Sequence, residues 1–131
     1  MAKKKIILVT GVAGFIGSNY INYMVKKYQN YFFIGLDMLT GIARKSNIDV
    51  LNHKNFIFSR CDIRDRIELQ KIFDTYMPTD VVHFAAETHV DYSIKNPIIF
   101  SETNVNGTNN LLYLSRNYSI NRFHFISTDE I

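Results

Sequence analysis

The sequence contains one cysteine, two prolines and no tryptophan among its 131 residues. A single cysteine, Cys61, excludes a disulfide framework within the chain and is typical of a reducing compartment, which predicts a cytoplasmic protein. No apolar run approaches the roughly 20 residues of a membrane span. The apolar stretch 6–9 is too short for the core of a signal peptide. We therefore expect neither a membrane partner nor a secreted, disulfide-stabilised domain.

The chain also lacks a strong excess of charge. The sequence has fifteen Lys and Arg residues and twelve Asp and Glu residues, and outside positions 3–5 the basic residues are scattered. No basic stripe with interleaved aromatic residues is present, so nucleic acid is not an expected partner. Hydrophobic residues make up 47% and charged residues 21%, which is typical of one globular domain and excludes disorder. Residues 1–131 are therefore treated as a single domain.

Five short apolar segments, which are separated by patterns of helical period or by turns, predict buried strands. The strands are expected at residues 5–10, 31–36, 55–60, 80–84 and 122–127. Helices are expected at 15–28, 65–76 and about 98–117, and residues 38–53 read as a loop with at most a helical turn. This alternation predicts an α/β fold with a doubly wound parallel sheet of strand order 3-2-1-4-5. Ligands of such sheets bind at the carboxyl ends of the strands, between the first and fourth strands.

A glycine turn joins the first expected strand to the first expected helix. Gly11, Gly14 and Gly17 have GxxGxxG spacing, which suits a tight turn, close approach of a pyrophosphate and close packing of helix on strand. Asp37 ends the second strand, 20 residues beyond Gly17, where an acid binds the ribose hydroxyls of NAD and repels the 2′-phosphate of NADP. The alternatives are turn and packing glycines, and a strand-end capping acid. The pattern favours NAD as the cofactor.

Polar residues also follow the later strands. Asp62 and Ile63 follow the third strand, on the side expected for adenine, with a loop or cap acid as a nearly equal alternative for Asp62. His89 and Asp91 lack a third ligand at suitable spacing, so no metal is expected. The adjacent acids Asp129 and Glu130 could divide acid and base roles in the ligand crevice, or form a solvated acidic segment.

Several segments together resemble the extended short-chain dehydrogenase/reductases, and within them the NAD-dependent epimerase/dehydratase family of dTDP-glucose 4,6-dehydratases. The segments are TGVAGFIG (10–17), DMLT (37–40), HFAAETHVDYSI (83–94) and FISTDE (125–130). The resemblance runs from about residue 5 to residue 131. It implies a Rossmann domain that binds NAD and a sugar nucleotide such as dTDP- or UDP-glucose as substrate.

The resemblance implies roles for individual positions. The pyrophosphate would be bound by Gly11, Gly14, Phe15, Ile16 and Gly17. The adenosine would be bound by Asp37, Met38, Leu39, Thr40, Asp62 and Ile63. The rest of the cofactor would be lined by Phe84, Ala85, Ala86, Glu87, Thr88 and Thr103. Thr88 and Thr128 would contact the sugar nucleotide. The reaction oxidises C4, eliminates water across C5–C6 and returns hydride to C6. In this reaction Thr128 would form a hydrogen bond to the sugar near its 4-hydroxyl, Asp129 would protonate the departing 6-hydroxyl, and Glu130 would remove the proton from C5.

One feature of the resembling family is missing. Its Tyr-x-x-x-Lys pair lies further downstream in relatives, and the only match here, Tyr23 with Lys27, falls in the first expected helix and is interpreted as coincidental. We therefore expect an incomplete NAD-binding domain that is inactive alone and self-associates through an unprotected fifth strand. The alternatives are a non-catalytic nucleotide-binding or interaction module, and a related sugar-nucleotide epimerase or decarboxylase.

Overall fold

The chain folds around one five-stranded parallel sheet. The computed structural model describes residues 5–39, 44–84 and 102–126, apart from the side chains of 102–104. The strands are β1 (Ile6–Thr10), β2 (Phe32–Asp37), β3 (Phe56–Arg60), β4 (Asp80–His83) and β5 (Arg122–Phe125). They lie in the order β3-β2-β1-β4-β5, and every pair of neighbours is parallel. The predicted fold class and strand order are confirmed.

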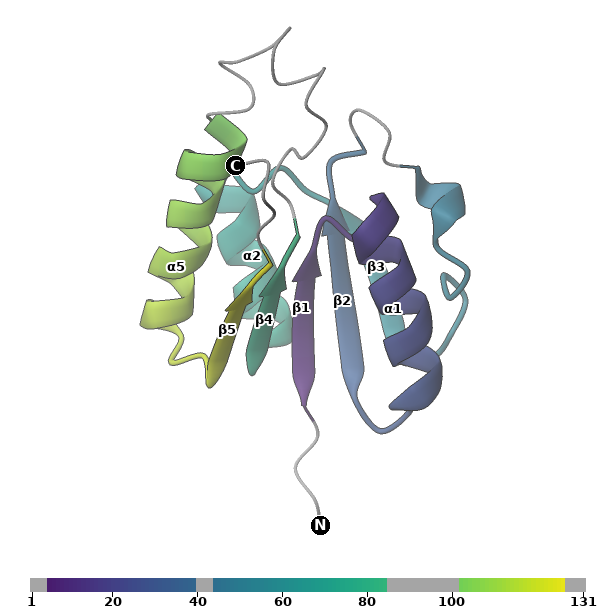
Figure 1. Ribbon diagram of the computed structural model, residues 1–131. Coiled ribbons are helices and arrows are strands. Elements are labelled where there is room, and N and C mark those ends of the chain that lie inside the picture. The colour runs from purple at the N-terminus through teal and green to yellow at the C-terminus, as the bar shows by residue number, and fades with distance from the viewer. Residues whose placement is uncertain (1–4, 40–43, 85–101, 127–131) are drawn as a thin grey trace, which may run out of the picture.

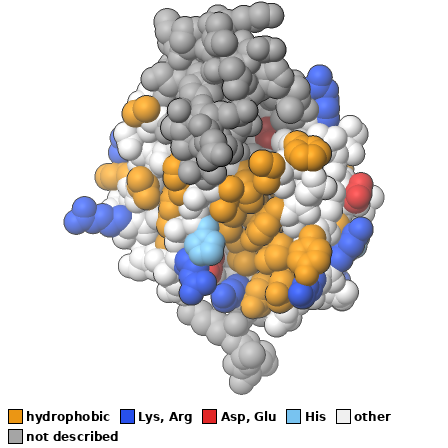
Figure 2. Space-filling model, in the orientation of Figure 1, with side chains coloured by type: hydrophobic (Ala, Val, Ile, Leu, Met, Phe, Trp, Pro, Cys, Tyr) orange, Lys and Arg blue, Asp and Glu red, His pale blue; other side chains and the backbone are white. Residues whose placement is uncertain are grey.

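Helices cover the two faces of the sheet unequally. On one face α1 (Phe15–Lys27) packs over β1 and β2, together with the segment that carries the short helix η1 (Lys45–Asn47). On the other face lie α2 (Arg66–Tyr76) and α5 (Thr108–Asn117), as Figure 1 shows. The core therefore has two apolar layers, one centred on Val9 and Phe33 and the other on Leu8 and Phe73. This arrangement leaves the β4–β5 half of the α1 face without a helix among the described residues, and Figure 2 shows hydrophobic side chains gathered there.

Local sequence explains where the helices begin. Asp65 caps α2, because its side chain accepts a hydrogen bond from the Glu68 amide at 3.2 Å. The α1 helix is instead preceded by Gly14, which has no side chain to cap it, and no acidic residue lies in its first turn. The positive end of the α1 dipole is therefore uncompensated by its own helix. Among the described residues, no helix is both long and apolar enough to cross a membrane.

The third predicted helix differs from expectation. Instead of one α-helix from about 98 to 117, the described part is a π-helical turn, Glu102–Gly107, followed by α5; residues 98–101 lie outside the described residues. At the junction a Cβ on Gly107 would lie 2.4 Å from Ile63 Cδ1. A larger residue at 107 would therefore have to displace the end of the Ile63 side chain, and the wider turn leads into α5.

Candidate functional site

The glycine turn follows β1 directly at the carboxyl edge of the sheet. Gly11 has a φ of 70°, which favours glycine, and its amide donates to the Leu36 carbonyl of β2 at 2.8 Å. The Val12 amide donates to the same carbonyl at 3.2 Å. The turn is therefore tied to the end of β2 as well as to β1, and its backbone has little freedom to move.

Gly17 lets α1 approach this turn. A Cβ built on Gly17 would lie 2.0 Å from the Gly11 carbonyl oxygen, a distance no real Cβ adopts. The close packing leaves Phe15 73% exposed and Ile16 48% exposed at the start of α1. The first-turn amides of a helix have no acceptor within the helix. The structure thus presents an accessible helix N-terminus of the kind that binds phosphate groups.

Asp37 lies beside the glycine turn at the end of β2. Its carboxylate accepts one hydrogen bond from the Ala13 amide at 2.9 Å and another from the Leu39 amide at 2.7 Å. These two bonds orient the carboxylate at the rim of the turn and fix Leu39, whose φ of 64° is in the left-handed region. The capping role and the ribose-binding role considered for Asp37 are therefore compatible, since backbone bonds hold the carboxylate in place.

The end of β3 lies next to the end of β2. Asp62 forms an ion pair with Arg64 at 2.7 Å, and hydrogen bonds from the Arg64 side chain lower the pKa of the carboxyl group. The Arg60 side chain donates to the Met38 carbonyl at 3.2 Å. The structure thus brings Asp62 and Ile63 to the same edge as Met38, on the side away from β4. The Asp62 carboxylate is already engaged by Arg64.

β4 completes the edge on the other side of β1. The Phe84 amide donates to the Thr10 carbonyl at 3.0 Å, so Phe84 lies beside the residue that precedes the glycine turn. His83, the last residue of β4, is completely buried. Its ring nitrogens lie 2.6 Å from Thr10 Oγ1 and 2.8 Å from Thr108 Oγ1.

Two asparagines that the sequence analysis did not identify also support the site. The Asn47 side chain donates to the Ala13 carbonyl at 2.9 Å and so holds the glycine turn from the η1 side. The Asn110 side chain donates to the carbonyls of Ile63 and Arg64 at 2.8 and 2.9 Å, which holds α5 to the end of β3. Both lie in segments with no motif, and their partners are distant backbone atoms. No local signal could have identified them.

Several predicted site residues lie outside the described residues. These are Thr40, Ala85, Ala86, Glu87, Thr88, Thr128, Asp129 and Glu130. Thr103 is described only as part of the π-helical turn. The described residues that the sequence predicts to bind cofactor follow β1, β2, β3 and β4, and the parallel order places them at one edge of the sheet.

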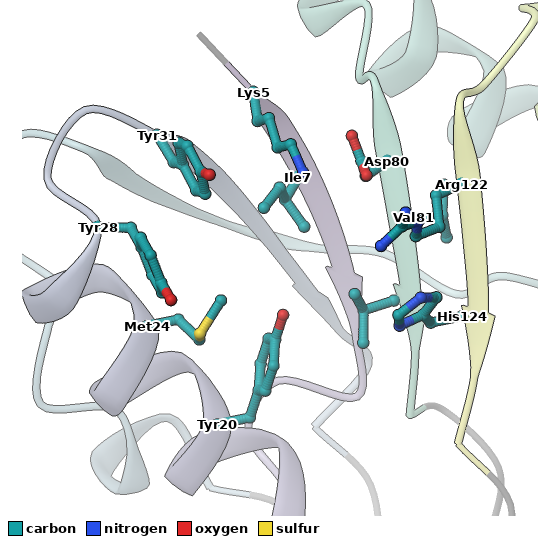
Figure 3. A pocket seen from close by; sticks show the side chains of 11 residues that line it. Lys5, Ile7, Tyr20, Met24, Tyr28, Tyr31, Asp80, Val81, Arg122 and His124 are labelled. Atoms are coloured by element: carbon teal, nitrogen blue, oxygen red, sulfur yellow. The ribbon is translucent and has the colours of Figure 1, made fainter.

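A separate hollow of about 210 Å³ lies at the opposite edge, near the amino ends of the strands. In Figure 3 the side chains of Tyr20 and Met24 reach it from α1 and that of Tyr28 from just after the helix, while Asp80 and Arg122 reach it from β4 and β5. None of the predicted cofactor residues lines this hollow.

Cys61 is not suited to be a nucleophile. It is buried, and burial together with the nearby charges of Asp62, Asp65 and Glu68 raises the pKa of its thiol to about 11. The thiolate, which is the reactive form, is therefore scarce at neutral pH. Cys61 therefore serves as a packed small residue.

Comparisons with known proteins match nearly the whole chain. The family model for GDP-mannose 4,6 dehydratase matches residues 8–131. The dTDP-glucose 4,6-dehydratase of Haemophilus influenzae is 42% identical, in a match that covers 95% of this chain and 40% of that protein. The dTDP-glucose 4,6-dehydratase 1 of Escherichia coli is also 42% identical, with 95% and 37% covered. The chain thus spans about 40% of the length of the curated relatives it matches.

Solved structures give the same result. The dTDP-glucose 4,6-dehydratase of Bacillus anthracis, in complex with NAD, superposes with a TM-score of 0.83 at 36% identity and covers 95% of this chain and 38% of its own. The UDP-glucose 4-epimerase of Thermotoga maritima, with UDP-glucose, has a TM-score of 0.83 at 33% identity, with 94% and 38% covered. Both resemble the entire described sheet.

Proposed function

Because this chain belongs to the GDP-mannose 4,6-dehydratase family, we propose that it supplies the NAD-binding part of a sugar-nucleotide 4,6-dehydratase. The observation that carries the proposal is the accessible N-terminus of α1 at the glycine turn, with the oriented carboxylate of Asp37 beside it. A dTDP-linked glucose is the favoured substrate, since the relatives at 42% identity are dTDP-glucose 4,6-dehydratases. A cytoplasmic location, which the lone free Cys61 supports, completes the proposal.

The described residues fit this cofactor. The amides at the start of α1 would bind the pyrophosphate, and Asp37 would accept hydrogen bonds from the adenosine ribose. Met38 and Ile63 would line the adenine side, with Asp62 held beside them by Arg64. NAD, when bound, supplies the acceptor and later the donor of the hydride. The protein's part is to bind and orient it at the end of β4, next to Phe84.

The proposed catalytic residues follow β5. Thr128 would bond the sugar hydroxyl at C4, Asp129 would protonate the leaving hydroxyl at C6, and Glu130 would remove the proton from C5. The Tyr23–Lys27 pair receives no catalytic role. Its hydroxyl and ammonium lie 2.9 Å apart on the exposed surface near the C-terminus of α1, at the other end of the helix from the glycine turn.

Titration calorimetry with NAD and NADP tests the proposal. We expect NAD to bind and NADP to bind at least about 10-fold more weakly, because Asp37 repels a 2′-phosphate. Asp37→Asn should weaken NAD binding about 10-fold or more and reduce the preference over NADP. The matched control is Asp49→Asn, which makes the same charge change at an exposed position on the η1 side. Absence of heat at millimolar NAD, with the chain folded, would contradict the proposal.

A related 4-epimerase is the second candidate, because the Thermotoga maritima enzyme matches the described fold as well as the dehydratase does. The acid pair Asp129 and Glu130 favours the dehydratase, since an elimination of water needs an acid and a base at neighbouring carbons. Release of a 4-keto-6-deoxy product from dTDP-glucose by the whole protein would identify a dehydratase. Interconversion of UDP-glucose at C4 would identify an epimerase. A non-catalytic nucleotide-binding module would bind NAD and yield neither product.

We also propose that the chain self-associates through β5. This strand lies at the edge of the sheet and pairs only with β4 among the described residues, and Phe125 and Ile126 are 49% and 38% exposed. Open strand edges with apolar side chains favour pairing with another chain. Light scattering coupled to size exclusion should detect dimers or larger species at micromolar concentration. Phe125→Lys should shift the distribution toward monomer, and a monodisperse wild-type monomer would refute self-association.

A further inference from the structure

A buried hydrogen-bond chain runs along the α5 face of the sheet, next to the candidate cofactor site. It runs from Thr10 Oγ1 through the imidazole of His83 to Thr108 Oγ1, with distances of 2.6 and 2.8 Å. The Phe84 amide donates to the same Thr10 hydroxyl at 3.0 Å. The chain thus joins the last residue of β1, the last residue of β4 and the first residue of α5.

The surroundings of His83 make this chain rigid. The His83 side chain is completely buried, and its ring stacks on Phe125 of β5 with centroids 5.3 Å apart and planes 24° apart. The ring centroid of Phe123 lies 6.4 Å from that of His83. A neutral imidazole has one nitrogen that donates and one that accepts, so either tautomer satisfies both threonine contacts. Burial lowers the pKa of the ring to about 4, which keeps it neutral at physiological pH.

The two threonines at the ends of this hydrogen-bond chain adjoin the segments that the cofactor is proposed to contact. Thr10 immediately precedes Gly11, whose turn leads to the phosphate-binding start of α1. Thr108 follows the π-helical turn that contains Thr103, and Gly107 packs against Ile63 of the adenine side. A phenylalanine at position 83 would fill the same space without burying a polar group. We therefore infer that the two His83 hydrogen bonds do more than fill space, and that they fix α5 relative to the glycine turn.

We propose that His83 is a positioning residue for the cofactor, which acts through Thr10 and Thr108 to hold the glycine turn and the start of α5 at the separation that NAD requires. This inference rests on the proposed function. His83 touches neither the cofactor nor the substrate in this role. It sets the distance between the two halves of the crevice, one supplied by β1 and α1 and the other by β4 and α5.

Two substitutions remove hydrogen bonds between Thr10, His83 and Thr108 while keeping side chains of similar shape. His83→Phe retains an aromatic ring to stack on Phe125 but removes both hydrogen bonds, and Thr108→Val replaces the hydroxyl by a methyl group of similar size. We expect each to raise the dissociation constant of NAD about 10-fold, the loss typical of one well-placed hydrogen bond. The double variant should be no worse than either single variant, because both break the same chain.

The controls separate positioning from stability. Ser115→Ala removes a buried hydroxyl from the same helix that has no hydrogen-bond partner among the described residues, and it should leave NAD binding unchanged. His83→Gln, which can both donate and accept, should recover part of the affinity lost in His83→Phe. Thr108→Val removes the hydrogen bond to one ring nitrogen of the buried His83, so its urea midpoint should fall, and NAD affinity is compared without urea, where both proteins are folded. Equal NAD affinity in Thr108→Val and wild type under those conditions would overturn the proposal. If His83→Phe does not fold, Thr108→Val alone decides the matter.

A second measurement is independent of cofactor binding. If the wild-type chain does not bind NAD, the proposed function fails, but the mechanical link can still be read from amide chemical shifts. Thr108→Val should then shift the amides of Gly11 and Val12, which lie across the sheet from α5, while Ser115→Ala should not. Shifts confined to α5 and β4 would overturn the link itself.

Discussion

Gly17→Ala should destabilise the fold by more than about 3 kcal/mol, the largest effect we expect from any single methyl group in this chain. The added Cβ would lie 2.0 Å from the carbonyl oxygen of Gly11, 2.9 Å from its carbonyl carbon and 3.2 Å from Val12 Cα. These are backbone atoms held by the bonds to the Leu36 carbonyl. They can make room only if α1 lifts from the sheet or the turn opens. Urea unfolding followed by circular dichroism measures the loss.

Gly14→Ala is the matched control, three residues earlier in the same motif. A Cβ there meets only the Gly11 carbonyl oxygen at 3.5 Å, an ordinary contact, and the φ of −76° suits any residue. The free energy of unfolding should change by less than about 1 kcal/mol. NAD binding should nevertheless fall, since the methyl group occupies the helix entrance where the pyrophosphate is proposed to lie. A Gly17→Ala variant with wild-type stability would refute this account of the turn.

Acidification should remove about 3 kcal/mol of stability through His83 alone. The pKa of His83 is about 4 in the folded chain and 6.5 in its ordinary state, and each pKa unit corresponds to about 1.4 kcal/mol. Because the folded pKa is the lower one, the unfolded chain binds the extra proton first as the pH falls. The contribution is complete above about pH 6.5, declines from there to about pH 4 and is lost below it.

The His83→Phe variant isolates this contribution. Asp62, whose pKa is lowered by Arg64, also loses stabilising interactions in acid, so the wild-type curve alone mixes two groups. Subtracting the variant's unfolding free energies at pH 7, 5.5 and 4 from those of the wild type leaves the His83 term. We expect this difference to fall by about 3 kcal/mol across that range. An imidazole that titrates near pH 6.5 by NMR would contradict the prediction.

The sheet was predictable because its signals are local. Each strand is a short apolar run ended by Gly11, Asp37 or a similar polar or glycine residue, and right-handed crossovers then leave few orders for five parallel strands. The glycine turn was predictable for the same reason, since three glycines and one acid at fixed spacing carry the motif. The role of Asp37 in holding Ala13 and Leu39 adds to that reading and does not change it.

The supporting polar residues were not predictable, because their partners are far away in the sequence. His83 lies in an apolar strand, where the pattern alone cannot distinguish a buried, bonded ring from a surface one. Only the pairing of β1 with β4 places it beside Thr10. The π-helical turn before α5 likewise depends on the approach of Gly107 to Ile63, a contact across 44 residues that no helical period encodes.

The parallel order has a consequence for how the chain assembles. β1 pairs on one side with β2, where Ile6 faces Phe32, and on the other with β4, where Ile7 faces Asp80. During synthesis its first edge is covered early, while the second stays open for more than 40 further residues and is exposed to aggregation. The Thr10–His83–Thr108 chain forms only after α5 arrives. A bound cofactor would therefore select molecules that have finished folding, and added NAD should raise the yield of native chain on refolding.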